Sequence, residues 1–232
     1  MQILWIRHGK TLGNVQRRYV GRTDEGLTDE AKLCLQKKQV LMQDLCVQTE
    51  SDRNPGKWYH AGAFVPDFVY SSPMMRCRET AEILFPGQVL CVQEGLQETD
   101  FGDFEYKNYE ELKENPAYQA WIDSNGTLPF PGGESREAFI KRCEQGFYRM
   151  LIGIKGRLQK MDEKQPASKI TAGAVVHGGT IMAILSSFYG GDYFDHQVKN
   201  GGGYRCLLSR TREQPKLQGV ENIMGESERV IP

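Results

Sequence analysis

The sequence has little of what marks membrane, metal-binding or nucleic-acid-binding proteins. No apolar run approaches the ~18 residues that a membrane-spanning helix needs. The apolar stretch before Arg7 is also too short for the core of a signal peptide. We therefore expect a cytoplasmic protein that does not enter a membrane.

Clustered cysteines and excess charge are also missing. The six cysteines form no C-x-x-C or Cys/His ligand spacing, so we expect neither a zinc site nor a disulfide framework. With 29 basic and 30 acidic residues the formal net charge is −1, so no broad basic field exists to hold nucleic acid. A strong anion site would have to come from a few convergent cations.

The apolar pattern alternates between strands and helices. That order favours a three-layer α/β/α architecture with a mostly parallel central sheet. The expected strands are 3–6, 67–70, 88–92, 174–176 and one through Tyr204, Cys206 and Leu208. Helices are expected after the N-cap Thr28 (with Ala31, Cys34 and Leu35 inside), over 74–84 with Ser72 as cap, from Ser135 to Leu158, and over 180–189.

Other stretches give weaker signals. Residues 48–66 are expected to be a loop, and the polar tail after Thr211 gives no firm signal. Residues 97–133 are polar and aromatic with one short helix near 109–123, and we expect a cap or lid there. The whole chain, 1–232, is expected to be one domain.

Two histidines share one local setting. His8 follows the apolar run Ile3–Ile6 and Arg7, His177 follows Ala174–Val176, and each is followed by glycine. Open α/β sheets present reactive groups at the carboxyl ends of strands, where glycine lets an anion approach. Either motif alone is equally consistent with a histidine whose hydrogen bonds are satisfied within the core. Together they predict a paired site for an anionic substrate.

A third junction adds a cation. Arg76 lies in the first turns of the helix expected after Ser71-Ser72-Pro73, near the same sheet edge. Arg78 lies two residues on and faces a different direction, so the two arginines do not share one pocket easily. The alternative is a pair of solvated helix arginines. With the two histidines, Arg76 becomes a candidate anion ligand.

The His8, Arg76 and His177 motifs, together with three further short sequence blocks between them, come in an order that resembles the histidine phosphatase (phosphoglycerate-mutase-like) superfamily. The resemblance spans residues 3 to 179 and is closest to the phosphatase branch, including α-ribazole phosphatase-like members. The matching residues are Arg7, His8, Gly9, Thr11 and Asn14; Gly21, Arg22, Asp24, Leu27 and Thr28; Ser71, Ser72, Arg76, Thr80 and Ala81; Leu96, Glu98, Phe101, Gly102 and Glu105; Gly133, Glu134 and Ser135; and His177, Gly178 and Gly179.

The resemblance implies a phosphatase that works through a phosphohistidine. His8 would attack the phosphoryl group and Glu98 would protonate the leaving alkoxide. The remaining implied ligands of the substrate are Arg7, Asn14, Gly21, Arg22, Arg76, His177 and Gly178. No metal or cofactor is implied, and the expected partner is a small phosphate monoester, on a monomer or homodimer.

Alternatives from other classes remain. A cofactor-dependent phosphoglycerate mutase would share the phosphohistidine, and a non-catalytic binder would share the pocket. The stretch Glu98–Tyr106 is closer to the small phosphatases than to the mutases. Lys10, Gly26 and Tyr106 depart from the family pattern, which affects the expected fit to substrate more than the chemistry. α-Ribazole 5′-phosphate is one candidate among sugar and nucleotide monophosphates.

Overall fold

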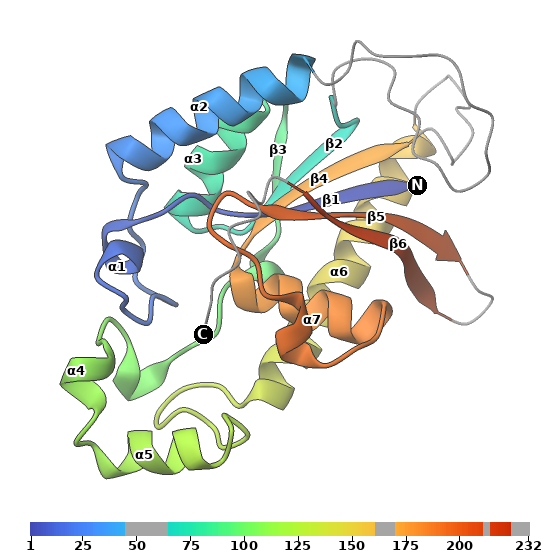
Figure 1. The fold of residues 1–232 in the computed structure, drawn as a ribbon. Coiled ribbons are helices and arrows are strands. Elements are labelled where there is room, and N and C mark those ends of the chain that lie inside the picture. The colour runs from blue at the N-terminus through green and yellow to red at the C-terminus, as the bar shows by residue number, and fades with distance from the viewer. Residues whose placement is uncertain (45–64, 161–169, 211–213, 224–232) are drawn as a thin grey trace.

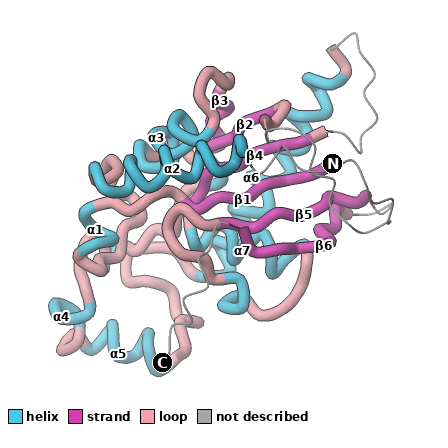
Figure 2. Tube along the Cα trace, turned by 45° about the horizontal axis from the view of Figure 1, so that its top comes forward, coloured by secondary structure: helices cyan, strands magenta, loops and turns pink. Residues whose placement is uncertain are grey.

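The computed structural model describes residues 1–44, 65–160, 170–210 and 214–223. Its strands form one sheet in the order β3-β2-β4-β1-β5-β6 (Figure 2). The strands are β1 (Gln2–Arg7), β2 (Phe68–Ser71), β3 (Leu90–Val92), β4 (Thr171–Val176), β5 (Gly203–Arg210) and β6 (Pro215–Ile223). The predicted loop at 48–66 lies almost entirely outside the described residues.

The predicted mostly parallel sheet is confirmed. β3, β2, β4 and β1 run parallel, while β5 is antiparallel to both β1 and β6. β6 is not predicted, because the sequence after Thr211 carries no strand signal. It is an edge strand in which Leu217 is the fully buried apolar residue, so it lacks the apolar pattern of a core strand. Its pairing with β5 gives it a place in the sheet.

Helices cover both faces of the sheet (Figure 1). α2 and α3 lie on one face, and α6 and α7 lie on the other. The helices are α1 (Leu12–Val15), α2 (Asp29–Asp44), α3 (Met75–Leu84), α4 (Tyr109–Leu112), α5 (Pro116–Asp123), α6 (Arg136–Leu158) and α7 (Gly178–Phe188), with short 3-10 turns at Glu94–Leu96, Gly102–Phe104 and Tyr193–His196. The three-layer α/β/α prediction is confirmed.

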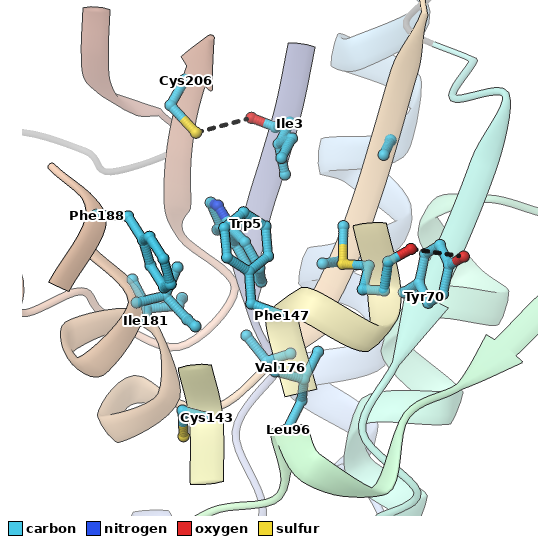
Figure 3. Close-up of a cluster of buried hydrophobic side chains, with 14 of the residues drawn as sticks. Ile3, Trp5, Tyr70, Leu96, Cys143, Phe147, Val176, Ile181, Phe188 and Cys206 are labelled. Carbon is cyan, nitrogen blue, oxygen red and sulfur yellow. Dashed lines mark hydrogen bonds between the residues drawn. The ribbon is translucent and has the colours of Figure 1, made fainter. Parts of the chain in front are cut away.

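Alternation along β1 divides the core between the two faces. Ile3 and Trp5 pack against α6 and α7, whereas Leu4 and Ile6 pack against α2 and α3. Phe147 of α6 is fully buried and meets the edge of Trp5 with ring centroids 5.5 Å apart (Figure 3). The predicted apolar stripe of α6 is buried as expected, from Phe139 to Ile154.

Several predicted helix boundaries and contacts are wrong. α3 begins at Met75 with Met74 as N-cap, and Asp24 accepts the Met75 N–H at 2.6 Å. Ser72 Oγ makes only a long contact of 3.5 Å with the Met74 N–H and lies 2.8 Å from His177. α7 begins two residues earlier than predicted, at Gly178. Cys34 of α2 is exposed, because it faces a pocket rather than the core.

Residues 97–133 contain two short helices, α4 and α5, instead of one, because Asn115 caps a new helix at Pro116. These helices lie away from the sheet (Figure 1). The segment has its own small core around Phe104, Leu112 and Tyr118. Among the described residues, no helix is long and apolar enough to cross a membrane.

The buried ring of Phe147 provides a test of the core. We expect Phe147→Ala to lower the free energy of unfolding by about 3–5 kcal/mol, because a cavity replaces the contacts with Trp5 and Phe188. Ile152→Ala on the same helix is the control, since Ile152 is 69% exposed. Urea denaturation measures both variants, and equal losses would contradict this account of the core.

Candidate active site

The strand register brings the two histidines together. Arg7 of β1 pairs with Val176 of β4, so His8 and His177 leave adjacent strands side by side. β2 flanks β4 on its other side, with Ser71 opposite Val175, so Ser72 also leaves the sheet beside His177. The rings of His8 and His177 lie edge to face with centroids 5.2 Å apart. The predicted pairing of the two motifs is therefore present.

His8 is held in one tautomer. Its Nδ1 lies 2.7 Å from the Gly9 carbonyl oxygen, so Nδ1 carries the proton and donates to it. The lone pair is then on Nε2. Burial lowers the pKa of His8 well below 6.5, and the charges of Arg76 and Arg7 lower it further. His8 is thus a neutral imidazole with a nucleophilic nitrogen.

Arg7 and Arg76 bring two cations to this sheet edge. No ion pair among the described residues includes either guanidinium. Arg76 is fully buried and donates to the carbonyls of Val20, Gly21 and Thr23. Arg7, which is partly buried, donates from Nη1 to the Val198 carbonyl at 2.8 Å, while its buried Nε has no partner. Two positive charges withdrawn from solvent without an ion pair favour an anionic ligand at this position.

His177 links Arg76 to Ser72. Nε of Arg76 donates to Nδ1 of His177 at 3.4 Å, which leaves the proton on Nε2 to donate to Ser72 Oγ at 2.8 Å. Burial lowers the pKa of His177 well below 6.5, with Arg76 as the next cause. His177 is therefore neutral as well. It is also the residue that precedes α7, so the free N–H groups of that helix start beside it.

Asn14 and Gly178 lie close to His8 and Arg7: Asn14 is connected to His8 through Asn200, and Gly178 lies beside Arg7. Asn14 Oδ1 accepts from the Thr11 N–H and from Asn200 Nδ2, so its own amide N–H groups remain for other acceptors. Asn200 Nδ2 also bonds the His8 carbonyl at 3.2 Å. A Cβ on Gly178 would lie 3.4 Å from Arg7 Cζ, so the start of α7 borders the Arg7 guanidinium.

Glu98 approaches the site from the loop after β3. Its carboxylate accepts from the N–H of Thr99 at 3.0 Å and of Gly179 at 3.3 Å. The first turn of α7 thus holds the carboxylate near the pocket. Burial lowers the pKa of Arg7, and the charge of Glu98 opposes that effect, as expected for near neighbours.

Gly21 and Arg22, also predicted as substrate ligands, lie in the loop around Arg76. The Gly21 N–H donates to Glu105 at 2.9 Å and its carbonyl accepts from Arg76, so both backbone groups are already bonded. Arg22 is 72% exposed and forms an ion pair with Asp100.

Tyr106 stands where the family pattern has glycine. It adopts φ +57°, the left-handed region that favours glycine, and its hydroxyl donates to Glu25.

A pocket of about 1170 Å³ opens at this point. Arg7, Gly9, Glu98 and Gly178 are among the described residues that line it, whereas His8, Arg76 and His177 are buried behind the lining. Aromatic residues from the loop after His8 and from 97–133 form one wall: Tyr19, Phe101, Trp121 and Phe130. Residues 97–133 therefore border the pocket in the place where a cap is expected.

The sequence does not predict the contacts that three residues make in the site. Asn200 and Ser72 bond the predicted ligands directly, and Arg142 of α6 bonds the backbone of Glu98. Ser72 lies in a recognised block, but a serine in that place indicates a helix cap. The signal at Asn200 is weak because this residue stands in a polar, glycine-rich run, and nothing in Arg142 itself distinguishes it from a solvated helix arginine.

The fold and the site define an α/β protein in which a neutral histidine and two arginines lie together at the carboxyl ends of parallel strands, next to a pocket. The chain belongs to the histidine phosphatase superfamily (branch 1), whose model matches residues 56–222. Arg76, Glu98 and His177 lie in the matched stretch, whereas Arg7 and His8 precede it.

Similar proteins agree with this membership. A bifunctional protein of Mycobacterium tuberculosis is 30% identical over 67% of this chain, which spans 38% of that protein. An adenosylcobalamin/alpha-ribazole phosphatase of Escherichia coli is 28% identical over 65% of this chain and 66% of that protein. The crystal structure of the alpha-ribazole phosphatase from Shigella flexneri has a TM-score of 0.67, with 22% identity over 94% of this chain and 95% of that one, and supports the fold.

The neutral histidines give stability a pH dependence. Unfolded histidines take up protons below about pH 6.5. Buried His8 and His177 resist protonation, because burial lowers the pKa of each. The unfolded state then holds more protons, so stability decreases as the pH falls from about 6.5. We expect His8→Gln to lose stability less steeply than wild type on acidification, measured by urea denaturation across pH without added phosphate. Parallel curves would contradict buried neutral histidines.

Proposed function

We propose that this protein is a phosphomonoesterase that hydrolyses a small phosphorylated metabolite through a phosphohistidine on His8. The observation that carries the proposal is the pair of guanidiniums, Arg7 partly and Arg76 fully buried, next to an imidazole whose Nε2 is unprotonated. A phosphoryl transition state is stabilised by positioning and by fixed positive charge, which this site supplies.

In this mechanism Nε2 of His8 attacks phosphorus in line with the leaving oxygen. The P–O bond to the leaving group breaks, and the Nε2–P bond forms. Arg7, Arg76, Asn14, His177 and the Gly178 N–H hold the non-bridging oxygens. His177 must exchange a present hydrogen bond for a phosphate oxygen, because both its nitrogens are bonded.

Glu98 supplies the proton to the leaving alkoxide. It then accepts a proton from the water that attacks the phosphohistidine, which regenerates His8 and releases phosphate. Arginine charges neutralise the phosphoryl oxygens, so we expect turnover in the presence of EDTA. Sugar and nucleotide monophosphates are candidate substrates. α-Ribazole 5′-phosphate is one of the candidates, which the alpha-ribazole phosphatase named above supports.

The rival functions are a cofactor-dependent phosphoglycerate mutase and a non-catalytic binder. One set of assays separates the three. Release of phosphate from p-nitrophenyl phosphate with EDTA present supports the phosphatase. Activity confined to 3-phosphoglycerate with 2,3-bisphosphoglycerate supports the mutase. No activity in either assay supports the non-catalytic binder. A panel of metabolite monophosphates then identifies the preferred leaving group.

His8 is tested by substitution. We expect His8→Ala to abolish turnover and to leave no acid-labile phosphoprotein, because the substitution removes the nitrogen that attacks phosphorus. Rapid acid quenching with a ³²P-labelled substrate measures the intermediate. Ile152→Ala, which is exposed on α6, is the control for handling and folding. Normal turnover by His8→Ala would refute nucleophilic catalysis by His8.

Glu98 is tested by its dependence on the leaving group. We expect Glu98→Gln to slow hydrolysis of an alkyl phosphate by about 10²-fold or more, because an alkoxide needs a proton to leave. Hydrolysis of p-nitrophenyl phosphate should change little, since nitrophenolate is a stable anion. The measurement is kcat for both esters, and equal slowing would remove Glu98 from the role of acid.

A further inference from the structure

Two side chains donate to the backbone carbonyls of the loop that carries Glu98. Thr180 of α7 donates to Leu96 at 3.3 Å and to Gln97 at 3.2 Å, and Arg142 of α6 makes the larger set of bonds. Arg142 Nη1 donates to the carbonyls of Gly95 at 3.3 Å and Gln97 at 3.2 Å, and Nη2 donates to the Glu98 carbonyl at 3.0 Å. A planar guanidinium presents five donors in a fixed geometry. Arg142 therefore fixes the backbone on the amino-terminal side of the Glu98 carboxylate.

Glu134 fixes Arg142 and the other side of the loop. Its two oxygens accept from Nε and Nη2 of Arg142 at 2.8 and 2.7 Å, a bidentate ion pair. Glu134 also accepts the Asp100 N–H at 3.1 Å, and its own N–H donates to the Asp100 carbonyl at 2.9 Å. The Arg142–Glu134 ion pair therefore hydrogen-bonds the backbone on both sides of Glu98, at Gly95 and Gln97 before it and at Asp100 after it.

The same helix face contacts this loop directly. A Cβ on Gly95 would lie 2.7 Å from Gly146 Cα, so the backbones of the loop and of α6 touch. Gly146 is four residues after Arg142, which places the two on one face of the helix. The loop therefore packs directly against α6, and its hydrogen bonds to Arg142 and Thr180 oppose movement away from the helix.

The Glu98 carboxylate is oriented by backbone groups. Among the residues that the structure describes, it accepts only the two N–H groups of Thr99 and Gly179, and no ion pair includes it. Its position therefore follows from that of its backbone. The guanidinium of Arg142 donates to Glu134 and to the carbonyls of this loop, so its hydrogen bonds act on Glu98 through the backbone. Its charge also contributes, as a minor cause, to the lowered pKa of His177.

We propose that Arg142, held by Glu134, is a positioning residue that sets the reach of the Glu98 carboxyl group to the leaving oxygen. The proposal rests on the proposed function, because it assumes that Glu98 donates the proton. Loss of Arg142 then impairs protonation of the leaving group and leaves binding of the phosphoryl group intact.

The test is a comparison of esters in Arg142→Met and Arg142→Lys. We expect Arg142→Met to slow an alkyl phosphate by about 10- to 10²-fold, as displacement of a catalytic group does. Its kcat for p-nitrophenyl phosphate and its Ki for inorganic phosphate should stay near the wild-type values. Arg142→Lys should recover part of the loss, since one ammonium replaces part of the donor set. Lys141→Met, which removes an exposed charge from the preceding position of α6, is the matched control.

The double variant Glu98→Gln/Arg142→Met decides the mechanism. It should be no slower towards the alkyl ester than Glu98→Gln alone, because the positioned group is already lost. Multiplied effects, or equal slowing of both esters with a raised phosphate Ki, would overturn the proposal while leaving Glu98 as the acid. If Glu98→Gln slows both esters equally, Glu98 is not the acid and Arg142 cannot act by positioning it. Should Arg142→Met fold poorly, Glu134→Gln tests the same prediction with a smaller expected loss.

Discussion

The site depends on two guanidinium groups held beside a neutral imidazole without an ion pair. Carbonyl oxygens accept from both Arg7 and Arg76, but within the described part of the chain no carboxylate forms a salt bridge with either. Burial and these two charges lower the pKa of His8 and keep its Nε2 unprotonated. An anion with three oxygens would compensate the cations and present phosphorus to that nitrogen. In the proposed function, the same arrangement lets the cations bind the phosphoryl group and lets the histidine attack it.

The sheet places these groups without contributing to their chemistry. β4 lies between β1 and β2, so three parallel strands end at one point and deliver His8, His177 and Ser72. Arg76 comes from the helix that follows β2. The antiparallel strands β5 and β6 extend the sheet on the other side, and the turn before β5 contributes Asn200.

Much of this could be predicted from sequence because apolar runs and glycine are local signals. The runs before His8 and His177 indicate buried strands, and their pairing follows from the geometry of parallel sheets. β6 could not be predicted, since its pairing with β5 depends on a neighbour rather than on its own pattern. The role of Ser72 also escapes, because a serine before a helix is typical of a cap, and the imidazole that it bonds is distant in sequence. Predicting the role of Arg142 requires knowing which backbone carbonyls face α6.

The contact between Gly95 and Gly146 also limits how this chain can be engineered. Replacing a helical glycine with alanine usually raises thermal stability, because it reduces the freedom of the unfolded chain. At position 146 the added methyl group would meet the Gly95 carbonyl carbon at 2.8 Å. A substitution chosen from helix propensity alone would therefore displace the loop that carries Glu98 from α6.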